Sequence, residues 1–545
     1  AVVGLEHLRT DLAGQGLRLE FGAVRRPVYV AAVDAWIGRS VPPPPAEHRE
    51  KAFDAAQALK ARGVLDLLDG GGVAAREARD MRAERALLRR FSEARSSAAG
   101  QRQRLAVLAA LPTLWSAGPT ASASRAPSAG GAISSALPEG TVLAEFLLGH
   151  RVSYLWLVDR DGVRLVYLPG SAVIGPTLSA YQATLLQPTM RREEWAKHVR
   201  LGTELTRMLF QDALPQVLAA RRLIVAGDGA LHGLPFSTLI VSSKAKGGAP
   251  DYLVRHLPVT QVPSGSAWLA LSERGSPPHQ YDLDLLAVGD PVLIDGRAPL
   301  RVDVEFGDAS VTFVTSHQRG VALPTLPHAR RELEVIDGLL RGGRTVTLHG
   351  QDATESALRS AAPHGARYLH FATHGLSDAV PRLPHATEGI ERAEEPALVL
   401  APGPAGDGLL GVDEIMAWGV DAEVVVLSGC STGRGWAERG EASYGLSAAF
   451  LHGGSRRVVA SLWSVADRQT RSLMVRLYRG MHRGLSPDVA LREAQLQMLG
   501  SRPARGTRDL RGVEGITDAA PEVRAEAGPA AMPPYYWAPF VVIGD

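Results

Sequence analysis

Short apolar runs alternate with longer amphipathic stretches from residue 140 to the end of the sequence. The apolar runs span 154–158, 163–168, 223–225, 285–288, 345–348, 368–371, 424–427, 458–462 and 540–543. The stretches between them carry apolar stripes at helical spacing at Leu333/Ile336/Leu340, Leu473/Leu477/Met481 and Leu491/Ala494/Met498. Several runs contain no polar residue, which is typical of strands buried on both faces of a parallel sheet. The pattern therefore predicts an α/β fold with a doubly wound, mostly parallel sheet.

A different pattern covers residues 1 to about 115. Apolar residues recur there at helical spacing in Leu5/Leu8/Leu12, Tyr29/Val33/Trp36 and Ala52/Ala56/Leu59. Four consecutive prolines at 42–45 separate two of these helices, because proline cannot continue a helix interior. A narrow apolar seam over 74–111 is compatible with a coiled pair of helices. Residues 1–115 therefore predict an α-helical region.

Two polar segments without a period divide the chain. Residues 116–139 are rich in Ser, Ala, Gly and Pro, a composition typical of a flexible linker. Residues 501–530 are rich in Arg, Glu, Ala, Pro and Gly, which predicts a loop inserted before the last strand. The first of these segments is the predicted boundary between the helical region and the α/β region.

Composition and charge narrow the class of protein. The chain has 545 residues, 45% of them apolar and 21% charged, and such a length corresponds to about two to four domains. Lys plus Arg number 59 against 57 Asp plus Glu, whereas nucleic-acid binders usually show a clear basic excess. No apolar run approaches the roughly 18 residues of a membrane span, and no signal pattern opens the sequence. We expect a cytoplasmic protein that binds neither nucleic acid directly nor membrane.

Metal and cofactor sites are not indicated by the sequence. A single cysteine, Cys430, excludes a disulfide framework or thiolate cluster within one chain. The 16 histidines are scattered without zinc-binding spacing. Gly227, Gly229 and Gly233 are spaced one residue too long for a dinucleotide-binding loop, so we interpret them as a turn. We therefore expect no cofactor and no metal ion.

Two of the predicted strands end in residues that can perform covalent chemistry. Cys430 follows the run 424–427 in the segment VVVLSGCSTG, and His374 follows 368–371 in YLHFATHG. The active site of an open α/β sheet lies at the carboxyl ends of its strands. If these two strands are neighbours, they lie about 4.8 Å apart and their terminal side chains can meet. Cys430 comes 56 positions after His374, a spacing similar to that of caspases.

A Cys–His pair at such an edge can act as nucleophile and base. The imidazole takes the proton of a thiol whose pKa is ordinarily about 8.5, and the thiolate attacks a carbonyl carbon. The backbone amides of Gly375 and Cys430 are the candidate donors of an oxyanion hole. Each residue alone has a simpler interpretation, because a cysteine after a strand is often a buried small apolar residue and His-Gly is often a turn.

Three other polar residues near these strands are interpreted as structural. His370 also ends an apolar run, and we take strand alternation to direct it away from His374. Asp290 and Asp378 could orient the site, but a turn residue and a solvated loop carboxylate are the simpler interpretations.

These segments together resemble the CHAT domain, a caspase-like group of clan CD cysteine peptidases related to separases. The resemblance covers about 140–545 and is carried by 141–149, 154–170, 228–239, 286–292, 326–336, 368–375, 397–403, 408–415, 424–435, 461–467 and 535–545. The paired HFATHG and SGCSTG segments are its specific part. It implies that His374 is the catalytic histidine and Cys430 the nucleophile. It further implies a non-catalytic caspase-like half at 140–275 and a catalytic half at 276–545.

The resemblance also concerns the region before the domain and the sequence around the nucleophile. CHAT proteins commonly carry helical TPR-type repeats before the domain, and 53–68 is similar to that boundary. Many relatives have Ala-Cys-Glu-Thr-Gly at the nucleophile, whereas this chain has Gly-Cys-Ser-Thr-Gly at 429–433, closer to the separase pattern. The thiol, the turn glycine and the histidine are all present, so the departure does not indicate an inactive enzyme.

A preference for the substrate is implied at Asp467. Separases, which cleave after Arg, have an acidic residue after a Leu-Trp strand, and Asp467 in SLWSVAD matches that place. The resemblance implies that Asp467 binds substrate and favours Arg or Lys through a charge-assisted contact. The alternative role is capping of a helix that begins near Arg468, and the alternative preference is a small or aliphatic residue.

The expected function is that of a cysteine endopeptidase acting on a protein substrate. The resemblance implies a role in bacterial stress or defence signalling, with a regulatory protein partner that binds the N-terminal helices. Two other functions stay open. One is a catalytically silent CHAT scaffold for protein–protein interaction, and the other is an amidase or transpeptidase that uses the same two residues.

Overall fold

The structure is a computed structural model of the chain. It describes residues 26, 29–37, 44–60, 130–243, 250–274, 281–292, 300–306, 309–318, 321–324, 326, 328–376, 396–403, 406, 408–429, 445–463, 467–500 and 532–545. Cys430, Asp378, the predicted coiled pair at 74–111 and the predicted loop at 501–530 lie outside the described residues.

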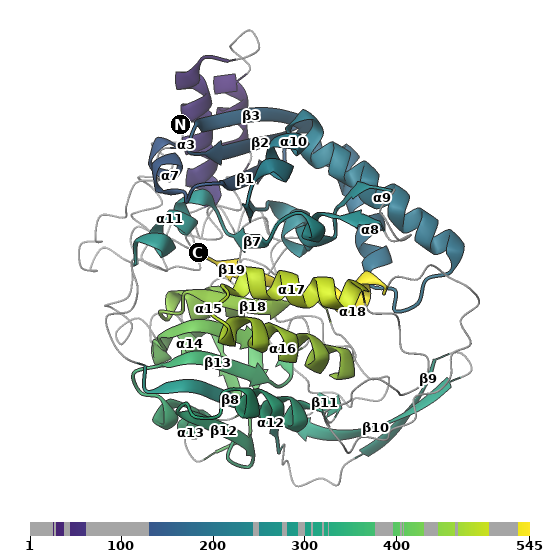
Figure 1. Cartoon of the computed structure of the whole chain (residues 1–545), viewed down its shortest axis with the longest axis vertical. Helices are drawn as coiled ribbons and strands as arrows, with labels where there is room; N and C mark the ends of the chain where they lie inside the picture. The colour runs from purple at the N-terminus through teal and green to yellow at the C-terminus, as the bar shows by residue number, and fades with distance from the viewer. Residues whose placement is uncertain are drawn as a thin grey trace, which may run out of the picture.

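In the described part of the chain, eleven strands form one central sheet (Figure 1). In spatial order they are β12 (Thr345–Gly350), β8 (Leu283–Pro291), β13 (Ala366–Ala372), β17 (Ala422–Leu427), β18 (Arg457–Ser461), β19 (Phe540–Gly544), β7 (Val259–Val262), β4 (Arg222–Ala226), β1 (Thr141–Leu147), β2 (Val152–Asp159) and β3 (Gly162–Pro169). Each of the nine apolar runs coincides with one of these strands, and only Leu462 of the run 458–462 lies one residue beyond its strand, so the predicted α/β class is confirmed.

Two strands of the sheet, β1 and β7, are not predicted by the apolar runs. Glu145 interrupts the apolar pattern of β1 and Gln261 that of β7, yet both side chains are buried. Glu145 is paired with Lys60, and Gln261 Nε2 donates a hydrogen bond to Leu234 O at 2.8 Å. These polar residues are tolerated in buried strands because partners from other segments satisfy them.

Two groups of neighbouring strands in the sheet run in opposite directions. β12, β8, β13, β17 and β18 are parallel to one another, and β19 is antiparallel to β18. β7, β4 and β1 continue in the direction of β19. The ends of the strands form two opposite edges of the sheet. The carboxyl ends of β4 and β1 lie at one of these edges, and those of β13 and β17 lie at the other.

Helices cover both faces of the sheet (Figure 1). They are α8 (Ser171–Leu185), α9 (Arg192–Phe210), α10 (Leu214–Ala219), α11 (Gly265–Glu273), α12 (Ala329–Leu339), α13 (Glu355–Ala361), α14 (Val412–Trp418), α15 (Leu446–His452), α16 (Asp467–His482), α17 (Pro487–Gly500) and α18 (Pro534–Trp537). The ring of His370 in β13 lies 5.5 Å from Tyr478 in α16, and the ring of its neighbour Phe371 lies 5.5 Å from Phe450 in α15. Successive strand residues face opposite sides, so α16 and α15 cover opposite faces of β13.

The three predicted apolar stripes lie in α12, α16 and α17, where Leu333, Leu477 and Leu491 are buried. Three small sheets and several short 3-10 helices occupy the described connections. The sheets consist of β5 (Ile240–Ser242) and β6 (Asp251–Tyr252), of β9 (Leu300–Phe306), β10 (Ala309–Gln318) and β11 (Val321–Pro324), and of β14 (Gly375–Leu376), β15 (Ala397–Val399) and β16 (Leu409–Gly411).

The N-terminal helices share a hydrophobic core with the first half of the sheet. Residues 29–37 are helical and α3 (Ala46–Lys60) follows, and both pack on the face of β1 and β2 (Figure 1). Phe53 is fully buried, and its ring meets Trp156 edge-on at 5.7 Å between centroids. Burial of such a side chain contributes about 1.5–3 kcal/mol. The predicted helical stripes that contain Tyr29 and Ala52 are confirmed in this core.

Part of the predicted linker is folded. Residues 116–139 are predicted as a flexible segment, but Gly130–Ala136 form helix α7. Ile133 is fully buried in the core beneath the N-terminal helices. The prediction is wrong for these seven residues because one buried isoleucine anchors a segment whose composition is otherwise that of a linker. Residues 116–129 lie outside the described residues.

Candidate active site

The two predicted catalytic segments leave neighbouring strands. β13 and β17 are parallel partners with Phe371 opposite Leu427, and Ser428 N extends the ladder by donating to Phe371 O at 2.8 Å. His374 is the second residue beyond β13, and Cys430 would be the third beyond β17. The strands are therefore neighbours, as a meeting of the two side chains requires. Cys430 lies outside the described residues, so its contact with the imidazole stays a prediction.

Gly429 brings the two strand ends into direct backbone contact. A Cβ atom on Gly429 would lie 2.2 Å from Thr373 O and 3.3 Å from Gly375 N. Real Cβ atoms do not approach a carbonyl oxygen so closely, hence only glycine allows this packing. The residue that precedes Cys430 therefore touches the residues on both sides of His374.

Hydrogen bonds from adjoining strands hold both turns in place. Val399 N, in β15, donates to His374 O at 2.9 Å, and Thr373 Oγ1 donates to Val399 O. On the other turn, Ser461 Oγ at the end of β18 donates to Gly429 O at 2.5 Å. His374 itself is 9% exposed. Hydrogen bonds to β15 and β18 therefore fix the positions of the two turns.

Residues 199–545, more than half of the chain, match the CHAT domain family. The chain belongs to the CHAT domain family. No curated protein sequence is detectably similar to it.

The solved structures similar to this CHAT protein have a caspase-like cysteine peptidase fold. One Saccharomyces cerevisiae separase–securin complex superposes with a TM-score of 0.50 at 10% identity, over 100% of this chain and 37% of the separase chain. A second structure of that complex gives 0.45 at 11% identity, over 83% and 33% of the two chains. The Arg-specific cysteine proteinase gingipain R gives 0.32 at 8% identity, over 69% and 75%. This chain spans about a third of the length of the separase chains, and the likeness shows the fold alone.

A buried polar network lies beneath the two turns of the CHAT domain. Glu332 in α12 is 1% exposed and His370 in β13 is fully buried. Glu332 Oε1 accepts a hydrogen bond from Ser428 Oγ at 2.7 Å and lies 3.0 Å from His370 Nε2. His370 Nδ1 lies 3.1 Å from the Tyr478 hydroxyl. His370 is thus fully buried and hydrogen-bonded, which agrees with its interpretation as a structural residue, and Glu332 links it to Ser428, two residues before Cys430.

The other predicted site residues have simpler positions. Asp467 is the first residue of α16, which follows β18; its side chain lies outside the described residues, so neither substrate binding nor capping is decided. Asp290, at the end of β8, has a left-handed φ of 47° and an ion pair with Arg330 at 3.4 Å. This conformation agrees with its interpretation as a turn residue.

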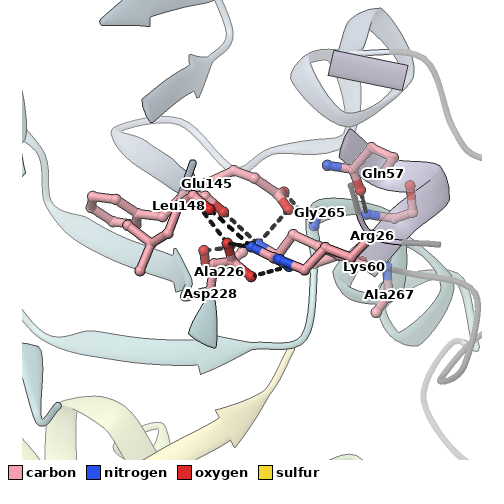
Figure 2. A network of polar contacts seen from close by, with 12 residues as sticks. Arg26, Gln57, Lys60, Glu145, Leu148, Ala226, Asp228, Gly265 and Ala267 are labelled. Carbon is pink, nitrogen blue, oxygen red and sulfur yellow. Dashed lines mark hydrogen bonds and ion pairs between the residues drawn. The ribbon is translucent and has the colours of Figure 1, made fainter. Parts of the chain in front are cut away.

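A second cluster of charged residues lies at the opposite edge, between the N-terminal helices and the first half of the sheet (Figure 2). Lys60 Nζ contacts Glu145 Oε1 at 2.8 Å and donates to Phe146 O at 3.1 Å and Ala226 O at 3.0 Å. Glu145 Oε2 accepts from Gly265 N at 2.8 Å. Both charged side chains are almost fully buried, and each finds several partners, as a buried charge requires.

Asp228, the second residue beyond β4, belongs to the same cluster (Figure 2). Its carboxylate accepts from Arg26 at 3.0 and 2.5 Å and from Leu148 N at 2.6 Å. Burial, followed by the charge of Lys60, lowers the pKa of nearby His232 to about 4. His232 is therefore neutral at pH 7, and the cluster consists of satisfied ion pairs.

Sequence reasoning did not single out Glu332, Glu145 or Lys60. The available signals were acidic residues within apolar patterns: Glu332 lies on the buried stripe of α12, and Glu145 interrupts a buried strand. A buried carboxylate implies a partner, but the partners come from segments far away in the sequence.

No helix among the described residues is long and apolar enough to cross a membrane. Within the same residues, no three His, Cys, Asp or Glu side chains gather closely enough to hold a metal ion.

Proposed function

We propose that this CHAT protein is a cysteine endopeptidase in which His374 activates Cys430. The observation that supports the proposal is the backbone contact of Gly429 with Thr373 and Gly375. It means that the residue before the thiol and the residues around the imidazole are in contact at one sheet edge. A shared edge of this kind is where α/β enzymes place their reacting groups.

The proposed reaction proceeds in two steps. The His374 imidazole takes the Cys430 proton, the thiolate sulfur bonds to the scissile carbonyl carbon, and the imidazolium then protonates the departing amine. Water next attacks the resulting thioester, giving a free carboxylate and restoring the thiol. The amides of Gly375 and Cys430 are the proposed donors to the oxyanion in both steps. Gly375 is supported in this role by its position against Gly429.

Specificity and control form the finer part of the proposal. Asp467 begins the helix after β18, the strand next to β17, and we assign it a preference for Arg or Lys before the cleaved bond. The substrate is a protein, cleaved in bacterial stress or defence signalling in the cytoplasm. A regulatory protein partner acts through the N-terminal helices, which pack on the first half of the domain.

The test compares newly formed protein N-termini in a cell extract treated with wild type, Cys430→Ala or His374→Ala. The proposal expects new termini with the wild type and none above background with either variant. Equal sets of termini from all three proteins contradict it. If the wild type produces no new termini, even with extract from cells in which the protein is activated, the silent scaffold is favoured instead. Fluorogenic peptides then separate specificities: faster cleavage after Leu than after Arg contradicts the role of Asp467.

A further inference from the structure

We propose that Glu332 is a positioning residue that holds the Cys430 turn in register with His374. The inference rests on the proposed function and adds to it a group that touches neither substrate nor the reacting atoms. It is based on one carboxylate oxygen that links the two strands on which the reaction depends.

Glu332 is buried within an apolar stripe of α12. Its neighbours Leu333 and Ile336 on α12 are fully buried, and Glu332 is 1% exposed on the same helix. An apolar residue there would pack without the cost of taking a carboxylate out of water. Such a group is retained only where its hydrogen bonds compensate that cost. The question is what those hydrogen bonds join.

Both hydrogen bonds end on one atom, Glu332 Oε1. Ser428 Oγ donates to it from the β17 side, and His370 Nε2 lies 3.0 Å away on the β13 side. Since a carboxylate only accepts, His370 carries its proton on Nε2. Glu332 Oε1 is therefore a bridge between the two strands, made from a third element that packs against the sheet.

The position of this bridge along the strands gives it its function. Backbone pairing between β13 and β17 continues as far as the bond from Ser428 N to Phe371 O. Beyond that bond, the chain turns through Gly429 toward Cys430. The side chain of Ser428 is thus held by Glu332 at the last point before the turn. Loss of the hydrogen bond between Ser428 and Glu332 would leave the orientation of the chain that leads to Cys430 less restricted.

Tyr478 supplies a matched control. Its hydroxyl lies 3.1 Å from His370 Nδ1, so it joins the same buried network but has no part in the bridge between the strands. Burial, followed by the neighbouring Tyr368 and Glu332, raises the pKa of Tyr478 well above its ordinary value. The hydroxyl is thus a neutral donor. Tyr478→Phe and Ser428→Ala each remove one hydroxyl hydrogen bond, and only the second breaks the link to β17.

The experiment uses the fact that Cys430 is the single cysteine of the chain. We expect Ser428→Ala in the full chain to slow iodoacetamide alkylation of Cys430 at pH 7 by about fivefold, since a thiol without its base is mostly protonated. On the peptide that the wild type cleaves fastest, kcat should fall about 10- to 100-fold with KM within about twofold, as for a group misplaced by up to 1 Å. The alkylation rate, kcat and KM of Tyr478→Phe should each stay within about twofold of the wild type, although its Tm should change about as much as that of Ser428→Ala. Ser428→Thr, which keeps a hydroxyl, should recover most of the rate.

The outcomes separate the inference from the proposed function. Wild-type rates in Ser428→Ala, or equal losses in Ser428→Ala and Tyr478→Phe, overturn the role of Glu332 even if His374→Ala slows alkylation. An alkylation rate unaffected by His374→Ala overturns the dyad, and the positioning role with it. Glu332→Gln is the second route, because its neutral amide oxygen is a weaker acceptor. It should give a loss smaller than that of Ser428→Ala, and a wild-type rate in this variant also counts against the inference.

Discussion

The two edges of the central sheet use the same structural position in different ways. Asp228 is the second residue beyond β4, and His374 is the second residue beyond β13. Asp228 is held by Arg26 and by Leu148 N, beneath the N-terminal helices. At the other edge, Gly429 packs against the residues around His374, and a buried hydrogen-bond network lies behind them. The same position beyond a buried strand thus carries a satisfied ion pair at one edge and the proposed catalytic histidine at the other.

The N-terminal helices contact only the first of these two edges among the described residues. They contribute Lys60 and a core of apolar residues to the first half of the sheet, where β1 and β4 have their carboxyl ends opposite to those of β13 and β17 (Figure 1). Ion pairing at the first edge and the proposed covalent chemistry at the second are thus separable. Mutations at the first edge should change stability, and mutations at the second should change reactivity.

The largest expected effect is on stability at the first edge. Lys60→Met leaves Glu145 buried without its cation, which should lower the free energy of unfolding by about 3–5 kcal/mol. Cleavage per folded molecule should stay within about twofold, because the proposed dyad belongs to the other edge. Urea unfolding measures the loss. The double variant Lys60→Met/Glu145→Gln, which removes the charge but keeps an acceptor for Gly265 N, should recover most of it; no recovery would show that the charge is not the cause.

The next effect concerns the glycines that precede each strand-end residue. Gly429→Ala should lower kcat about 100-fold, because its Cβ would lie 2.2 Å from Thr373 O and must displace the turn by about 1 Å. Gly227→Ala is the control: its Cβ would lie 3.3 Å from His232 Nδ1, which a small shift of the ring relieves. Steady-state kinetics on one peptide compare the two. Equal kcat values for the two alanine variants would contradict the role of the contact.

A smaller effect is the pH dependence of the first edge. Burial lowers the pKa of His232 from 6.5 to about 4, so below pH 6.5 the unfolded chain binds a proton that the folded protein does not. Stability is therefore complete above pH 6.5 and falls toward pH 4, by about 2 kcal/mol at pH 5. Urea unfolding at pH 7 and pH 5 should show this loss in the wild type and a loss smaller by that amount in His232→Gln. The same pH dependence in both proteins would contradict the assignment.

The smallest effects belong to two ion pairs that water can reach, Arg26–Asp228 and Lys51–Glu47. Arg26→Ala should cost about 1–2 kcal/mol, since Asp228 keeps its hydrogen bond from Leu148 N and water can reach the vacated place. Lys51→Ala breaks an exposed pair with Glu47 on α3 and should cost no more than about 0.5 kcal/mol. Thermal unfolding of both variants tests the order. A larger loss in Lys51→Ala than in Arg26→Ala would show that burial does not decide these contributions.

Much of the fold could be predicted from the sequence because patterns within short segments specify most of the strands and helices. Continuous apolar runs mark β13 and β17, and the stripe through Leu333 marks α12. The apolar runs do not predict strand β1, because Glu145 breaks its pattern and its partner Lys60 lies far away in the chain. The sequence does not predict helix α7, because its composition is that of a linker and Ile133 is the one large apolar side chain that it buries.

The candidate site could be predicted less completely. His374 and Cys430 are marked by the strands that precede them, but their adjacency depends on the order of strands in the sheet, which no local pattern specifies. The contact of Gly429 with Thr373 depends on that same order. The bridge through Glu332 was hidden for a further reason, because it joins three elements and looks in the sequence like an isolated acidic residue on an apolar stripe.

The most direct test of the dyad is the pH dependence of alkylation at Cys430, measured with iodoacetamide on wild type and His374→Ala. We expect reactivity in the wild type to be high already at pH 6–7, because a paired thiol ionises well below its ordinary pKa of about 8.5. In His374→Ala, reactivity should rise only around pH 8.5. The same profile in both proteins, with a midpoint near 8.5, would contradict the claim that His374 and Cys430 act together.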